Sequence, residues 1–226
     1  NRITAMAEDR KGNFFIGTYD GPVFFNRDSV NFSRLEYTFI NDNKKMRSLC
    51  KAIYIDPSGL VFFGMTGRGI LVFDPVKKSM QHKNLDPLKE DNWDHYRLNT
   101  VSSFLPDPFR SGKLWIGTFH GIFLMNINSG RIDRNFEVLN PPAKPQGSAI
   151  PQHYDVQKMH MPDDSTIWFS SWTGGMGKYH IPDGKARVFL HNSVAASANH
   201  DVGYIITSFE KWKPGLYFLG IHSPSP

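Results

Sequence analysis

Nine histidines are the side chains of this sequence best suited to metal binding or to acid–base chemistry. Zinc sites use His, Cys and carboxylate ligands at short spacings, as in His-Glu-x-x-His. The chain has neither that motif nor a tight His/Asp cluster, and Cys50 is its single cysteine. We therefore expect no metal site and no cofactor, and we expect Cys50 to be a small core residue.

Motifs for nucleophilic or phosphate chemistry are equally sparse. The segment FSSWTGG (169–175) places serines near glycines but lacks Gly-x-Ser-x-Gly, so a hydrolase elbow is unsupported. The Gly-rich stretches TGRG and WTGGMG fall between expected strands instead of before a helix, which is a poor arrangement for cradling phosphate. The acidic pair Asp163-Asp164 falls in a tight turn, where solvated Asp is common.

The elements that position these residues follow from an internal repeat. The stretch KLWIGTFHGIF (113–123) recurs, with variation, across the chain. Aligning the small residue after each aromatic pair selects Gly17, Gly64, Gly117, Ser170 and Gly220. These positions are separated by 47, 53, 53 and 50 residues, and such even spacing indicates a repeated structural unit.

Each unit predicts four short strands separated by turns. An apolar run such as 52–55 leads through an Asp, Pro or Gly turn to an aromatic strand such as 114–116. A Gly-bearing turn leads to a third strand such as 122–125, and a ragged fourth strand such as 187–190 follows. Four short strands in about 40 to 50 residues are typical of a β-propeller blade.

We therefore predict an all-β fold of four-stranded antiparallel propeller blades. The chain forms a single propeller segment, 1–226, with approximate blade units at 1–45, 46–97, 98–150, 151–197 and an incomplete 198–226. A short helix is expected within 86–98. About five units would leave strand edges exposed, so we expect the segment to be part of a larger, seven-bladed propeller.

Several repeated residues have architectural reasons. Three turn glycines are expected at positive φ, namely Gly12, Gly59 and Gly112. Three others are expected where neighbouring blades approach closely, namely Gly17, Gly64 and Gly117. The aromatic residues expected to fill the space between blade sheets are Phe15, Phe63, Trp115, Trp168 and Tyr217 or Phe218.

One end of the blades is the predicted ligand face. The loop between the second and third strands lies at the same end as the connection that enters the first strand. These loops and connections collect aromatic and planar polar groups, which suit sugar recognition by stacking and hydrogen bonding. The candidate ligand-binding residues are Tyr19, Asp20, Arg68, His120, His153, Tyr154, Trp172 and His200, and no catalytic residue is proposed. The alternative is that these side chains are ordinary loop tips or pack between blades.

The motifs DRKGNFFIGTYDG (9–21) and SGKLWIGTFHG (111–121) resemble the two-component regulator propeller repeat. The second unit departs from this pattern at Met65, the fourth at Ser170-Ser171, and the fifth after Gly220. The resemblance implies the periplasmic sensor region of a bacterial hybrid sensor histidine kinase of the Bacteroidetes type. It also implies carbohydrate sensing, with downstream sensor-kinase domains in the same chain.

The composition and charge of the chain narrow the classes of partner that it is expected to bind. The hydrophobic fraction of 40% and the charged fraction of 21% are those of a globular protein, and no stretch is long and apolar enough to span a bilayer. A net charge of +5 is spread over scattered residues, so nucleic acid is not expected as a partner. The expected partners are an oligosaccharide and the remaining propeller blades, with a homodimer left open.

Function is therefore predicted as non-enzymatic ligand sensing in the periplasm by a module of a two-component signalling protein. Two alternatives stay open. A propeller-fold glycosidase or lyase would need buried carboxylates on central strands, whereas a protein-interaction scaffold would need no small ligand.

Overall fold

The structure is a computed structural model, and it describes residues 2–37, 48–85, 93–134, 137–138, 155–171, 175–189, 205–213 and 216–222. The chain divides into two compact units, Asn1–Phe104 and Leu105–Pro226. The described residues are almost entirely β-structure, which confirms the predicted fold class.

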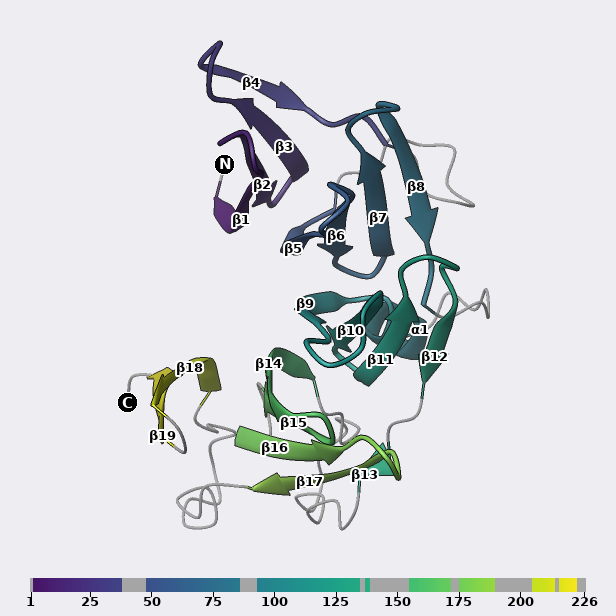
Figure 1. The fold of residues 1–226 in the computed structure, drawn as a ribbon, viewed down its shortest axis with the longest axis vertical. Coiled ribbons are helices and arrows are strands. Elements are labelled where there is room, and N and C mark those ends of the chain that lie inside the picture. The colour runs from purple at the N-terminus through teal and green to yellow at the C-terminus, as the bar shows by residue number, and fades with distance from the viewer. Residues whose placement is uncertain are drawn as a thin grey trace. The chain divides into compact units, whose positions relative to one another are not determined.

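The first two sheets each contain four antiparallel strands in chain order (Figure 1). The first sheet consists of β1 (Ile3–Glu8), β2 (Phe14–Thr18), β3 (Gly21–Asn26) and β4 (Asn31–Arg34). The second consists of β5 (Cys50–Ile55), β6 (Val61–Met65), β7 (Gly69–Asp74) and β8 (Ser79–Lys83). The predicted short helix is α1 (Trp93–Leu98), which follows the second sheet.

The third sheet repeats this order with β9 (Val101–Pro106), β10 (Lys113–Thr118), β11 (Gly121–Asn126) and β12 (Ile132–Arg134). The boundary between the two compact units falls within β9. The last two described strands, β18 (Ile205–Lys213) and β19 (Leu216–His222), form an antiparallel pair.

The fourth sheet departs from the predicted four strands. It contains β14 (Val156–Asp163), β15 (Thr166–Ser171), β16 (Gly175–His180) and β17 (Lys185–Phe189). A fifth strand, β13 (Glu137–Val138), precedes this sheet in the chain and pairs in parallel with β17 at its outer edge. This pairing covers backbone groups that a blade edge would otherwise expose.

Asp side chains explain the Asp-x-x-Gly turns that join first and second strands. In the first turn, Asp9 Oδ1 accepts hydrogen bonds from the backbone N–H groups of Lys11 (2.8 Å) and Asn13 (2.9 Å). The same chemistry recurs at Asp56 and, with two extra residues, at Asp107. The turn glycines Gly12, Gly59 and Gly112 have φ of 79°, 96° and 73°, as predicted.

A bulge recurs in the pairing of first and second strands, and sequence reasoning did not anticipate it. In the first sheet Ile3 pairs with Thr18 and Ala5 with Gly17, so Thr4 is the extra residue. Equivalent register shifts lie between Cys50 and Ala52, between Val156 and Lys158, and between Ile206 and Ser208. Bulges bend a strand and increase its twist, which suits the inner strand of a propeller blade.

Close packing of each sheet on the first strand of the next sheet accounts for the repeated glycine in the first unit. A Cβ atom on Gly17 would lie 2.7 Å from the carbonyl oxygen of Cys50, and that same carbonyl accepts a hydrogen bond from the Thr4 hydroxyl. Likewise, a Cβ atom on Gly64 would lie 2.7 Å from Val101 Cγ1. Glycine is therefore required at both positions because the next first strand occupies the space of a side chain.

Aromatic residues of second strands pack on the following sheet. The ring of Phe15 lies 6.0 Å from that of Phe63, and Phe62 lies 6.4 Å from Phe104. In the second unit, Trp115 lies 6.0 Å from Tyr179. Phe15, Phe63 and Trp115 are buried, as predicted, and these contacts supply much of the apolar surface that holds adjacent sheets together.

Trp168 differs from its counterparts. It is only half-buried and lies 5.8 Å from the ring of Phe189 in its own sheet, while the next residue, Phe169, is fully buried. Cys50 is fully buried, as predicted, and burial raises its thiol pKa to about 12.

The first strand of the first sheet stands apart from its equivalents. Ile3 occupies the register position of Cys50, since each is the first paired residue before the bulge. Cys50 and Val101 are 0% exposed where they contact a preceding sheet, whereas Ile3 is 66% exposed. Among the described residues, no sheet covers Ile3 in the way that preceding sheets cover Cys50 and Val101.

Candidate functional site

The turns between second and third strands form the candidate ligand face, and a threonine shapes two of them. Thr18 Oγ1 donates a hydrogen bond to the carbonyl of Gly21 (2.8 Å) and accepts one from the N–H of Asp20 (3.1 Å). Thr118 Oγ1 makes the same pair of bonds with Gly121 (3.0 Å) and His120 (3.0 Å). The Gly-Thr-x-x-Gly motif therefore builds a fixed turn whose two central residues are free to vary.

The second sheet replaces this threonine with Met65 and supports its turn differently. The N–H of Thr66 donates to the carbonyl of Leu49 (2.9 Å), and the N–H of Gly67 donates to Thr100 Oγ1 (2.8 Å). A Cβ atom on Gly67 would collide with the ring of Tyr96 in α1. The turn and the connection that enters the next sheet thus lie together in the first unit, as the ligand-face prediction requires.

The predicted residues of the first unit occupy these turns. Tyr19 is 47% exposed, and the Arg2 guanidinium lies over its ring at 5.3 Å from the centroid. Asp20 follows it in the same turn and is half-buried, as is Arg68 in the β6–β7 turn. The exposed ring of Tyr19 and its adjacent cation are suited to stacking on a ligand.

A histidine that sequence reasoning did not select lies beside Arg68. His82 Nε2 lies 2.6 Å from the carbonyl oxygen of Arg68, and since a carbonyl only accepts, the imidazole donates this bond. Burial lowers the pKa of His82 from its usual 6.5, and the Arg68 charge adds to the effect, while the hydrogen bond opposes it. His82 therefore favours the neutral form and secures the β6–β7 turn to β8.

The remaining predicted residues fall into two groups. His120 occupies the β10–β11 turn of the second unit and is half-buried. His153, Tyr154, Trp172 and His200 lie outside the described residues. The structure thus places four of the eight candidates at the expected turns, three in the first unit and one in the second.

A propeller-fold glycosidase or lyase would use buried carboxylates for catalysis. Two buried carboxylates among the described residues, Asp155 and Asp107, are hydrogen-bonded to neighbouring side chains. Asp155 accepts hydrogen bonds from Ser171 Oγ (3.0 Å) and Gln157 Nε2 (3.2 Å). Asp107 Oδ2 accepts hydrogen bonds from Trp115 Nε1 (3.0 Å) and from Arg110 (2.9 Å). These bonds hold both carboxylates in fixed positions within the fold.

The opposite ends of the first two sheets contain a groove of about 1320 Å³ that sequence reasoning missed. It is lined by the turns that contain Asp9, Asp28, Asp56 and Lys78, with phenylalanines beneath them. The only trace of this groove in the sequence is an aromatic residue in each third strand, Phe24 and Phe73. The two residues line one cavity because their sheets pack side by side.

Neither a metal-ion cluster nor a membrane-spanning helix occurs among the described residues. They contain no group of three or more His, Cys, Asp or Glu residues arranged to hold a metal ion. Within the same ranges, no helix is both long enough and apolar enough to cross a bilayer.

Together, the repeated sheets and their Thr-shaped turns define a β-propeller segment. A model of the family described as "Two component regulator propeller" matches residues 1–20. The resemblance predicted from the repeat motif is therefore confirmed. Among curated proteins, none matches the sequence significantly.

Solved structures with the same fold include extracellular domains of proteins described as two-component systems. The extracellular domain of a protein described as hybrid two-component system BT3049 of B. thetaiotaomicron matches with a TM-score of 0.68 and 15% identity, over 98% of this chain and 27% of that one. The corresponding domain of BT4673 from the same organism matches with a TM-score of 0.62 and 15% identity, over 97% and 25%. The secretion-system surface component PorZ of Porphyromonas gingivalis matches with a TM-score of 0.59 and 17% identity, over 96% and 30%. The chain thus spans about a quarter to a third of the length of these proteins, and at such identities the likeness is one of fold.

Proposed function

We propose that this chain is a ligand-sensing propeller segment of a two-component signalling protein, located in the periplasm. The ligand is a carbohydrate bound at the turns between second and third strands, and the output is a histidine kinase elsewhere in the same protein. The family match at residues 1–20 and the fold of the hybrid two-component extracellular domains support this assignment.

The main support for the ligand face is that the Thr-shaped turns share their hydrogen bonds but differ in their two central residues. Their hydrogen bonds are the same in the first and third sheets, yet the two residues between Thr and Gly are Tyr19-Asp20 in one and Phe119-His120 in the other. A constant backbone with variable tips is the arrangement by which rigid scaffolds present binding residues. By repetition, Trp172 and its neighbours supply the fourth turn, and His153, Tyr154 and His200 supply the connections.

The exposed surface of β1 supports further blades as partners. Ile3 occupies the position at which Cys50 and Val101 are covered by a preceding sheet. A further repeat of the same type would therefore bury Ile3. We include such a repeat in the proposed sensor.

Ligand binding tests the proposal directly. Isothermal calorimetry of the complete propeller against a panel of oligosaccharides is expected to give saturable binding without release of shorter sugars. Tyr19→Ala and His120→Ala should weaken it, whereas Val76→Ala, at the opposite end of the second sheet, should not. Turnover of the sugar would instead identify a carbohydrate-active enzyme.

A further inference from the structure

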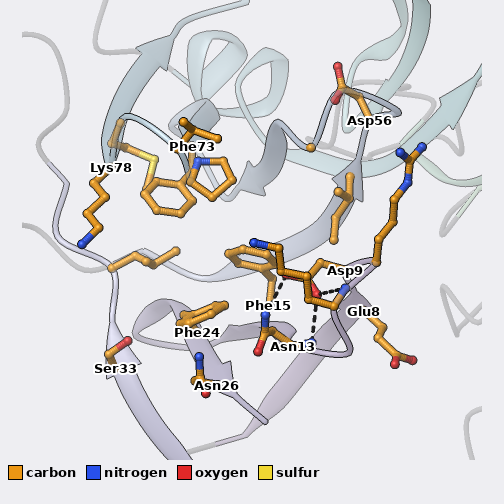
Figure 2. A pocket seen from close by; sticks show the side chains of 18 of the residues that line it. Glu8, Asp9, Asn13, Phe15, Phe24, Asn26, Ser33, Asp56, Phe73 and Lys78 are labelled. Carbon is orange, nitrogen blue, oxygen red and sulfur yellow. Dashed lines mark hydrogen bonds between the residues drawn. The ribbon is translucent and has the colours of Figure 1, made fainter. Parts of the chain in front are cut away.

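The inter-blade groove of the first unit is a second candidate binding site, remote from the turns of the ligand face. It lies between the first two sheets at the β1–β2, β3–β4, β5–β6 and β7–β8 turns, which occupy the opposite ends of the strands from the β2–β3 and β6–β7 turns. Figure 2 shows Phe15, Phe24 and Phe73 around the hollow, with Asp9, Asn13 and Asp56 at its mouth.

The floor of the groove is aromatic and apolar. The ring centroid of Phe15 lies 5.1 Å from that of Phe24 and 6.1 Å from that of Phe73. Phe15 is buried, whereas Phe24 and Phe73 are half-buried and so retain exposed ring surface. Leu35 and Met80 extend this lining, and together these residues offer a surface for an apolar anchor.

Planar polar groups at the mouth are already engaged within the turns. Both carboxylate oxygens of Asp9 accept hydrogen bonds, from Lys11 N, Asn13 N and Asn13 Nδ2. Asn13 Oδ1 accepts a further bond from the N–H of Arg27 (3.1 Å). Asp56 Oδ1 accepts bonds from Leu60 N (2.9 Å) and Ser58 Oγ (2.6 Å). These are the groups that would recognise sugar hydroxyls, so their engagement disfavours an oligosaccharide here.

Charged side chains of both signs surround the aromatic floor. Four cations line the groove, namely Arg10, Lys11, Arg34 and Lys78. Five carboxylates line it as well, namely Glu8, Asp9, Asp28, Glu36 and Asp56. This near balance disfavours a polyanion such as a nucleic acid, which would need a cationic surface. The four cations make no ion pair with any described carboxylate, so they are available to a partner.

The groove is large enough for a polymeric ligand. A volume of about 1320 Å³ exceeds the roughly 300 to 1,000 Å³ of typical small-molecule pockets. An extended polypeptide combines apolar anchors with charges of both signs along its length, which is the pattern of this lining. We propose that the inter-blade groove binds an extended peptide segment of a partner protein, with an aromatic or long aliphatic side chain on the phenylalanine floor and charged residues at the rim. This site is independent of the carbohydrate proposed for the ligand face.

Panning a phage-displayed library of random twelve-residue peptides on the 226-residue chain tests this inference. Enriched peptides are expected to share an apolar anchor flanked by charged residues. In fluorescence anisotropy, the selected peptide should bind about tenfold more weakly when its anchor is replaced by Ser. Lys78→Glu in the protein should weaken binding by a similar factor, because the rim charge contributes to recognition.

Matched variants separate the groove from general effects. Lys77→Glu makes the same charge change at the adjacent residue, which does not line the groove and pairs with Asp74 at 3.4 Å, so it should leave affinity unchanged. Phe24→Ser should abolish binding, and circular dichroism would show whether the variant is folded. If Phe24→Ser unfolds the chain, the Lys78→Glu and Lys77→Glu pair still decides the question.

Four results would overturn the inference. The first is the absence of enriched peptides, and the second is equal loss of affinity in Lys77→Glu and Lys78→Glu. The third is competition by maltohexaose, which would make the groove a sugar site. Self-association abolished by Lys78→Glu would assign it to a second copy of the chain instead. None of these results bears on oligosaccharide binding at the ligand face, so the two proposals fail separately.

Discussion

The α-carbon of Gly17 faces the backbone carbonyl of Cys50 so closely that an added Cβ atom would lie 2.7 Å from the oxygen. Neither partner can move freely, because that carbonyl also accepts the hydrogen bond of Thr4. We predict that Gly17→Ala lowers the free energy of unfolding by about 1 to 3 kcal/mol through overpacking. Urea denaturation followed by tryptophan fluorescence would measure the change, with Ser33→Ala on the exposed strand β4 as a control. Equal stability of the two variants would contradict the close-approach explanation.

The repeat was readable in the sequence because its defining interactions are local. The Asp9 and Asp56 turns close over four residues, and the Thr18 turn closes over three. Each therefore leaves a short motif with fixed spacing. The fold class, the strand order and the turn positions of Tyr19, Arg68 and His120 followed from these motifs.

Features that depend on distant segments left no comparable motif. The parallel pairing of β13 with β17 joins residues almost 50 positions apart through backbone groups that every residue possesses. The inter-blade groove likewise requires Phe24 and Phe73 to meet across two sheets. The bulge at Thr4 is repeated in position, but the extra residues, which include Lys51 and Gln157, share no side-chain chemistry that would mark it.

The hydrogen bonds of the threonine turns predict that serine, but not valine, can replace threonine with little loss of stability. Thr18→Val and Thr118→Val keep the shape of the side chain but remove the hydroxyl. Each should cost about 1 to 3 kcal/mol because one buried and one partly buried hydrogen bond are lost. Thr→Ser at either position should recover most of that stability. Thermal unfolding of the four variants would show it, and valine and serine variants of equal stability would refute the role of the hydroxyl.

The lowered pKa of His82 predicts how the stability of the fold depends on pH. Its pKa is lower in the folded chain than the usual 6.5, so the unfolded chain binds more protons at mildly acidic pH. Its contribution to stability is therefore fully present above pH 6.5 and is lost as pH falls toward the folded pKa. His82→Gln should flatten the fall in the urea midpoint between pH 7.5 and pH 5 relative to the parent chain. An unchanged slope would exclude His82 as the group responsible.

Cys50 offers a direct probe of unfolding, since it is the only thiol of the chain. With complete burial and a pKa raised to about 12, it should react with a disulfide reagent at pH 8 far more slowly than a free thiol. Urea should release this reactivity in parallel with the loss of β-structure in circular dichroism. Rapid labelling of the native chain would show that the packing of the first two sheets opens without global unfolding.

Ile3 tests whether a further blade packs on β1. In the 226-residue chain its side chain is 66% exposed, so Ile3→Asp should change stability by less than about 0.5 kcal/mol. If a further repeat precedes this chain, as proposed, the same substitution in a form that includes that repeat should cost at least about 2 kcal/mol, because it would place a carboxylate where Cys50 and Val101 are wholly buried. Val76→Asp, at a 90% exposed position, should have the same small effect in both chains. If Ile3→Asp were equally harmless in the longer protein, the surface of β1 would not be a blade contact, and its exposed Ile3 and Met6 would need another partner.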